Sequence, residues 1–168
     1  MKERLFSLFL ILTFIPCFLV SCTGEKEFTH CEMTLVLDES FSEEESEDFD
    51  LLVTNDDIAI SLIRISFEAG FNQGISDTYT AKGFAAFFMH KSEKSDTLLM
   101  HGDVPYYTYT ENTKEHDVFY TVTFYRSYNA YFVVAYAVPE WKKDELGEKL
   151  LDYAAKAYFN DAPEIKTN

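Results

Sequence analysis

The sequence is poor in the residues that build disulfide frameworks and zinc sites. Its 168 residues include three cysteines, Cys17, Cys22 and Cys31. None of them forms a Cys-x-x-Cys pair or stands at zinc spacing from a histidine, so we expect neither a disulfide scaffold nor a zinc site. A phosphate-binding loop and a Gly-x-Ser-x-Gly nucleophile elbow are also missing, and Gly70–Gly74 is interpreted as a turn. The sequence predicts no bound cofactor.

Basic residues are scarce as well. The chain has 14 Lys and Arg against 29 Asp and Glu, a net charge of −15. Acidic residues concentrate between Asp38 and Asp57, and no Lys or Arg occurs between Lys26 and Arg64. Because phosphate groups are bound by clustered Lys and Arg, this composition argues against a nucleic-acid partner. It also argues against electrostatic attachment to anionic lipid headgroups.

The N-terminus contains the one long apolar run. A short basic start is followed by Leu5–Val20, and the run ends in Leu19-Val20-Ser21-Cys22. This order of parts is typical of a bacterial secretory signal that ends in a lipobox, at which Cys22 is acylated and becomes the mature N-terminus. The sequence therefore predicts a signal peptide over 1–21, a tether over 22–31, a single domain over 32–160 and a tail over 161–168.

Two alternatives exist for this N-terminal segment. A transmembrane helix needs about 20 apolar residues, whereas this run is shorter and is broken by Pro16. A plain cleaved signal needs no cysteine at the cut. The lipoprotein interpretation is favoured, with the lipid bilayer as partner through the acylated Cys22 and the domain on the extracytoplasmic face of the cell membrane. Thr23 replaces the aspartate that retains some lipoproteins at an inner membrane, which favours the outer membrane in a two-membrane bacterium.

Most of residues 32–160 shows strand patterns. Met33, Leu35 and Leu37 recur at period two, which is typical of a half-buried strand. In Asp57–Phe67 the apolar alternation changes face, which predicts a β-bulge or a strand covered on both faces. The other predicted strands are Asp50–Thr54, Leu98–His101, Tyr106–Thr110, Val118–Arg126 and Tyr131–Val138. We expect the last three to form an antiparallel meander.

Two helices are expected among these strands. The cluster Ser76-Asp77-Thr78 predicts a helix start before Tyr79–Lys91. Pro139 ends the last strand and opens the second helix. Its apolar stripe repeats every four residues, at Leu146, Leu150, Ala154 and Tyr158. The predicted fold class is α+β, with an antiparallel sheet of about six to seven strands flanked by two helices.

This order of elements resembles the PsbP-like fold, and specifically its bacterial branch of DcrB-like lipoproteins. The resemblance rests on Met33–Phe41, on the strands Tyr106–Thr110 and Phe119–Tyr125, and on Tyr136-Ala137-Val138-Pro139 before a helix ending at Tyr158-Phe159. The chain departs from the family in lacking the proline and glycine of the first turn. The resemblance implies a mostly non-enzymatic accessory or binding protein, and it transfers no site residue to this chain.

The acidic residues of Ser42–Asp50 suggest a calcium site, since hard cations take several carboxylate oxygens. The stretch lacks the EF-hand order of acids and an internal glycine. The alternative is a solvated loop with self-repelling charges. Whether Asp38–Asp57 binds calcium stays open at this point.

Two turns place a carboxylate beside an imidazole, at His101-Gly102-Asp103 and at His116-Asp117. If the strands bring these turns together, they could form a weak metal or acid–base site. The alternative is that they are ordinary turn residues. A metal-dependent hydrolase is accordingly the least favoured function.

Tyrosines crowd the three strands of the expected meander. The candidate partner surface consists of Tyr106, Tyr107, Tyr109, Tyr120 and Tyr125. Side chains on adjacent antiparallel strands stand beside one another, and an exposed aromatic face suits a glycan, a peptide or an envelope protein. Cross-strand stabilisation of a solvated face explains the same pattern.

The sequence favours a membrane-anchored extracytoplasmic lipoprotein that acts as a non-enzymatic binding or accessory module of the cell envelope. An envelope structural or stress-response protein is the alternative.

Overall fold

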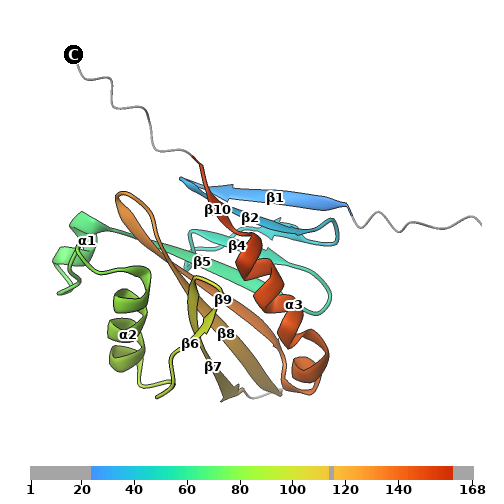
Figure 1. Cartoon of the computed structure of the whole chain (residues 1–168). Helices are drawn as coiled ribbons and strands as arrows, with labels where there is room; N and C mark the ends of the chain where they lie inside the picture. Colours follow the sequence, from blue (N-terminus) through green and yellow to red (C-terminus); the bar gives the residue numbers. More distant parts are fainter. Residues whose placement is uncertain (1–23, 114–115, 161–168) are drawn as a thin grey trace, which may run out of the picture.

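The computed structural model describes residues 24–113 and 116–160 and contains a seven-stranded sheet (Figure 1). The strands of this large sheet are β3 (Ser42–Glu44), β4 (Leu51–Thr54), β5 (Ala59–Ser66), β6 (Leu99–His101), β7 (Val104–Asn112), β8 (Asp117–Arg126) and β9 (Ala130–Pro139). They follow the order β3-β4-β5-β9-β8-β7-β6, and neighbouring strands are antiparallel. The predicted α+β class and the meander of the last three strands are confirmed.

A small sheet and helices complete the described part of the chain. The small sheet has the order β1-β2-β10 and consists of β1 (Glu25–His30), β2 (Met33–Asp38) and β10 (Tyr158–Phe159). The helices are α1 (Phe67–Phe71), α2 (Ala81–Ser92) and α3 (Lys143–Lys156), the last preceded by the 3-10 turn η1 (Glu140–Lys142). α2 covers one face of the large sheet, whereas α3 and the small sheet cover the other (Figure 1).

β9 lies inside the large sheet, and its alternating side chains enter two separate cores. Phe132, Val134 and Tyr136 belong to the core under α3, whereas Tyr131 and Val133 belong to the core under α2. Successive side chains of a strand point to opposite faces, so a strand covered on both sides is apolar throughout. This double burial explains the continuous apolar run that ends at Pro139.

β5 shows the same arrangement. Its register with β9 is unbroken from Ala59↔Ala137 to Ser66↔Ala130. Ile60 lies in the core under α3, and Ile65 packs against the core under α2. Of the two expectations for this segment, coverage on both faces is therefore right and the β-bulge is wrong.

α3 buries the predicted stripe only up to its end. Leu146, Leu150 and Ala154 are buried, but Tyr158 is 41% exposed. The helix stops at Lys156 because the next residue is extended and β10 pairs with β2. Tyr158 follows Ala154 by four residues, but it lies in a strand, so its place in the helical spacing is coincidental.

α2 begins two residues later than predicted. Its N-cap is Thr80, whose hydroxyl accepts a hydrogen bond from the Gly83 backbone N–H at 3.1 Å. The segment before it is held from the sheet, since the Tyr131 hydroxyl lies 2.8 Å from the carbonyl oxygens of Ser76 and Tyr79. The cluster predicted to cap the helix belongs to this anchored turn instead.

The predicted tether 22–31 is wrong for its described residues. Glu25–His30 forms β1, which pairs along its whole length with β2. Phe28 is buried in the core under α3. Because only one large apolar side chain of the segment is buried, period-two analysis alone could not detect this strand. Cys31 sits in the connecting turn with φ 52° and is exposed.

Two further segments differ from expectation. α1 occupies residues assigned to a strand end and a turn, and Gly74, with φ 78°, follows it. Part of the acidic stretch, Ser42–Glu44, is the edge strand β3, with exposed side chains. At the other end, the Asn160 N–H donates to the Glu32 carbonyl at 2.8 Å. The predicted tail over 161–168 lies outside the described residues.

Candidate partner-binding surface

The five predicted surface tyrosines divide between the two faces of the large sheet. Tyr107, Tyr109 and Tyr120 face the α2 side. Tyr125 enters the core under α3, and Tyr106 lies on that same face. They separate because strand neighbours alternate in direction, so Tyr106 and Tyr107 cannot share a face.

Tyr107 and Tyr125 are buried, with 2% and 8% of their surface exposed. The Tyr125 hydroxyl donates to the Ala154 carbonyl at 2.9 Å, and burial raises its pKa to about 12. The Tyr107 hydroxyl lies 3.4 Å from Ser92 Oγ at the end of α2. Their assignment to an exposed surface is therefore wrong, because both side chains pack the contacts between the sheet and a helix.

Tyr109 and Tyr120 form a stacked pair on the α2 side. They are directly opposite in the β7–β8 register, with ring centroids 4.8 Å apart and ring planes 10° apart. Lys94, in the loop after α2, lies 5.3 Å from the Tyr109 ring and forms an ion pair of 2.9 Å with Glu111. We call these four residues the tyrosine platform. Each of its two rings is partly exposed.

The platform tyrosines keep their protons at neutral pH. Burial, together with the neighbouring Tyr107, Tyr120 and Glu111, raises the pKa of Tyr109 to about 12. Burial, with the negative charge of Glu111, also raises the pKa of Tyr120, while Lys94 opposes this rise. The platform thus offers two ring faces, neutral hydroxyl groups and one balanced ion pair, a combination that suits polar aromatic contacts with a partner.

Tyr106 belongs to a different hollow. It is opposite Leu99 of β6 and lines a cavity of about 350 Å³ between the β6–β7 edge and α3. Phe119 and Gly147 line the same hollow. The predicted tyrosine surface therefore resolves into the platform on one face, Tyr106 on the other, and two core residues.

The two histidine–aspartate turns do not meet. His101-Gly102-Asp103 lies at the start of β7, and His116-Asp117 lies past its end. The eight residue steps of β7 separate them by about 27 Å. His116 instead packs edge-on against Trp141, with ring centroids 5.2 Å apart. The expectation that these strands bring the two turns together is wrong, because consecutive antiparallel turns lie at opposite ends of their shared strand.

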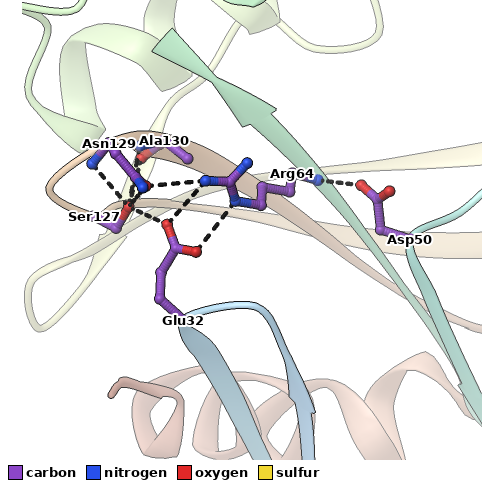
Figure 2. A network of polar contacts seen from close by, with 6 residues as sticks. All are labelled: Glu32, Asp50, Arg64, Ser127, Asn129 and Ala130. Atoms are coloured by element: carbon purple, nitrogen blue, oxygen red, sulfur yellow. Dashed lines mark hydrogen bonds and ion pairs between the residues drawn. The ribbon is translucent and has the colours of Figure 1, made fainter. Parts of the chain in front are cut away.

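A polar cluster that sequence reasoning missed joins the two sheets (Figure 2). The carboxylate of Glu32, in the β1–β2 turn, lies 3.2 Å from Arg64 Nε of β5 and accepts from Ser127 Oγ at 2.7 Å. Arg64 also donates to Asn129 Oδ1 at 3.1 Å. We call Glu32, Arg64, Ser127 and Asn129 the clasp. Its members are far apart in sequence, so no local pattern could reveal it.

Electrostatics favour a structural role for the clasp. Burial alone would raise the pKa of Glu32, but hydrogen bonds from Ser127, the backbone and Arg64 outweigh burial and lower it. The charged carboxylate is therefore matched by a cation and by donors. Ser127 Oγ also accepts the backbone N–H groups of Asn129 and Ala130, so it shapes the β8–β9 turn while holding Glu32.

The remaining predicted sites are the lipid attachment at Cys22 and the possible metal sites. Cys22 and the signal peptide lie outside the described residues. Within residues 24–113 and 116–160, no group of three or more His, Cys, Asp or Glu side chains is arranged to hold a metal ion. In the same residues, no helix has the length and apolar character needed to span a bilayer.

Comparisons with known proteins reveal the fold. No protein-family model matches the chain, and no curated protein sequence matches it significantly. A crystal structure from Bacteroides thetaiotaomicron superposes with a TM-score of 0.57 at 13% identity. The match covers 83% of this chain and 49% of that protein, so this chain spans about half of that protein's length. The solution structure of cyanobacterial PsbP (CyanoP) from Synechocystis gives 0.50 at 13% identity, with 86% of this chain and 97% of that one covered. The Saccharomyces cerevisiae Ran-binding protein Mog1p gives 0.51 at 12% identity, with 81% and 95% covered. At these identities the likeness extends to architecture, and the chain has a PsbP-like fold.

Proposed function

We propose that this protein is a cell-envelope lipoprotein of the DcrB-like branch, anchored through an acylated Cys22, whose PsbP-like domain is a non-enzymatic binding module. The lipobox-like sequence Leu19-Val20-Ser21-Cys22 supports the anchor. The tyrosine platform supports the binding role, and it is the single observation that carries it. Its partner is an envelope protein or glycan that packs on the Tyr109 and Tyr120 rings.

The structure sharpens what such an anchor would do. Gly24 is already attached to the domain, because its carbonyl accepts the Glu39 N–H at 3.0 Å. Only Thr23 stands between it and Cys22. Two residue steps reach about 7 Å at most, so an acylated Cys22 would hold the start of β1 close to the bilayer surface.

Acidic side chains near the start of β1 affect how the domain could be held at the membrane. Glu25 and Asp38 are neutralised by Lys156 and Lys149, at 2.7 Å in each case. Glu27 and Glu39 have exposed side chains and no ion pair among the described residues. Anionic headgroups would repel this end, so the acyl chains would have to supply the whole attachment.

The anchor is tested by replacing Cys22 with alanine in the full-length chain and fractionating cells. We expect the wild-type protein in the membrane fraction with a lipid-dependent mobility shift, and the Cys22→Ala protein in the soluble fraction. A Cys22→Ala protein that remains membrane-bound would contradict the lipoprotein proposal.

The platform is tested by crosslinking the full-length protein in intact cells. The double variant Tyr109→Ala/Tyr120→Ala should lose its specific crosslinked partner or its retention on a glycan. Tyr128→Ala is the matched control, because Tyr128 is 50% exposed but lies in the β8–β9 turn, away from the platform. A partner lost equally in the control, or retained in the double variant, would reject the platform as the binding surface.

A further inference from the structure

A second recess on the α2 side has the features of a small-molecule site. It is a cavity of about 230 Å³ between α2, β5 and the segment that follows α1. Ile65, Ile75, Phe87 and Phe88 supply apolar walls. We call it the α2 pocket. It contains none of the four platform residues.

The walls of the α2 pocket are held in place by the fold. The Ile75 N–H donates to the Gly70 carbonyl at 2.9 Å. A β-carbon on Gly70 would lie 3.3 Å from Ile75 Cβ and 3.5 Å from Ile65 Cγ2, so a glycine lets α1 pack closely against both isoleucines. Tyr131 fixes the next turn through the Ser76 and Tyr79 carbonyls. A pocket formed before its ligand arrives avoids an ordering cost on binding.

The polar side chains of the pocket differ in whether their hydrogen-bond donors are already used. Gln73, Lys91 and Ser92 complete its lining. Ser92 Oγ donates to the Met89 carbonyl at 3.1 Å, which uses its proton within the helix. The Lys91 ammonium and the Gln73 side-chain amide have no hydrogen bond or ion pair within the part of the chain that the structure describes. The donors left available at the pocket are therefore Lys91 and Gln73.

Lys91 is one of five described basic side chains, out of ten, that have no carboxylate partner. Arg64, Lys94, Lys142, Lys149 and Lys156 each have a carboxylate partner, and the whole chain carries a net charge of −15. Lys91 instead lies 5.9 Å from the centroid of the Phe87 ring, a wall of the pocket. An apolar cavity with a lone cation at its rim is complementary to an amphiphile with a negative head.

We propose that the α2 pocket binds a small monocarboxylic acid with an aromatic or short aliphatic body. The body occupies the space between Ile65, Ile75 and the two phenylalanines, and the carboxylate meets Lys91 and Gln73. The cavity volume of about 230 Å³ equals about eight water molecules at ~30 Å³ each, which suits a body of that size. This site is independent of the proposed partner surface and of the lipid anchor.

The site is tested by titrating the full-length protein with 3-phenylpropionate and monitoring binding through amide NMR shifts. We expect saturable binding below about 10 mM, with the shifts centred on Ile75 and Ser92. The affinity for the uncharged 3-phenylpropan-1-ol should be lower by about tenfold or more, because the alcohol loses the charge-assisted contact with Lys91.

Two lysines of the same helix provide matched variants. Lys91→Gln should weaken 3-phenylpropionate binding about tenfold or more, whereas Lys91→Arg should retain most of it. Lys82→Gln should leave binding unchanged, because Lys82 is exposed on α2, also lacks an ion pair in the described residues and does not line the pocket. Absence of saturable binding, shifts centred elsewhere, equal binding of the alcohol, or equal effects of the two glutamine variants would overturn the proposal.

Discussion

The two faces of the large sheet are covered to different extents. The α3 face carries a 14-residue helix together with the small sheet, and its core is continuous from Phe28 to Ala154. The α2 face carries α1 and a 12-residue helix, and leaves the tyrosine platform partly exposed and the α2 pocket open. The comparison separates stability from recognition, because the α3 face is closed by packing over most of its core, with the hollow beside Tyr106 at its edge, whereas the α2 face is covered incompletely.

The largest test of this comparison is a core truncation on each face. Leu150→Ala should lower the free energy of unfolding by about 2–5 kcal/mol, because Leu150 of α3 is fully buried. Phe87→Ala on α2 should cost less, because Phe87 is partly exposed and already borders a cavity. Urea denaturation of both variants measures the difference. Equal losses would contradict the assignment of the main stabilising core to the α3 face.

The clasp tests how the small sheet is held onto the large one. Arg64→Met should lower the free energy of unfolding by about 1–3 kcal/mol, because it leaves the poorly exposed Glu32 carboxylate without its cation. Lys82→Gln, on the surface of α2, should be nearly neutral. The measurement is again urea denaturation, with amide exchange of β1 as a second readout. Unchanged exchange in β1 would show that the clasp does not secure the small sheet.

The clasp should also make stability depend on pH. The pKa of Glu32 is lowered in the folded state. Its contribution is therefore complete above about 4.3, the ordinary glutamate value, and is lost as the pH falls through the lowered folded value. The difference in free energy of unfolding between wild type and Glu32→Gln should accordingly shrink as the pH is lowered from neutrality. A difference that grows on acidification would mean that the carboxylate is not stabilised in its charged form.

A smaller test concerns two buried tyrosines under α3. The Tyr136 hydroxyl is fully buried and has no hydrogen bond of acceptable geometry among the described residues, whereas Tyr125 donates to Ala154. Tyr136→Phe should leave the free energy of unfolding unchanged or raise it by up to about 1 kcal/mol, since a phenyl ring needs no partner. Tyr125→Phe should lower it by about 0.5–1.5 kcal/mol. Thermal unfolding of the two variants shows whether the changes in the free energy of unfolding have opposite signs. A loss of stability in both would indicate that the Tyr136 hydroxyl has a hydrogen-bond partner.

The smallest test compares two glycines. Gly147 lies inside α3, and a β-carbon placed on it would meet no atom within 4 Å apart from its chain neighbours and the nearby helix backbone. Gly147→Ala should therefore stabilise the protein by about 0.5–1 kcal/mol through helix propensity alone. Gly70→Ala should gain nothing, because its β-carbon meets Ile75 at 3.3 Å. Thermal unfolding decides, and a destabilising Gly147→Ala would indicate that α3 has a close neighbour at this position.

Much of the architecture could be predicted from short-range patterns. The period-two runs located most of the large sheet, and the four-residue spacing located the buried face of α3. β1 was missed because its stability comes from pairing with β2 and from one buried ring, Phe28. The clasp was missed for the same reason, since Glu32, Arg64 and Ser127 meet only after the sheets have assembled. The separation of the two histidine–aspartate turns, in contrast, follows from antiparallel topology and could have been predicted.

The candidate site shows the same division. The sequence placed Tyr109 and Tyr120 on neighbouring strands, but their stacking depends on the β7–β8 register, and their exposure depends on where α2 ends. By itself the sequence determined the α+β class, the strand meander, the acidic charge and the motif at Cys22. These are properties of composition and short-range periodicity. The tertiary structure alone decided which tyrosines are buried, that Lys91 stands beside an apolar cavity, and that the chain from Gly24 belongs to the domain. Each of these depends on contacts between segments distant in sequence, and such contacts leave no periodic signal in the chain.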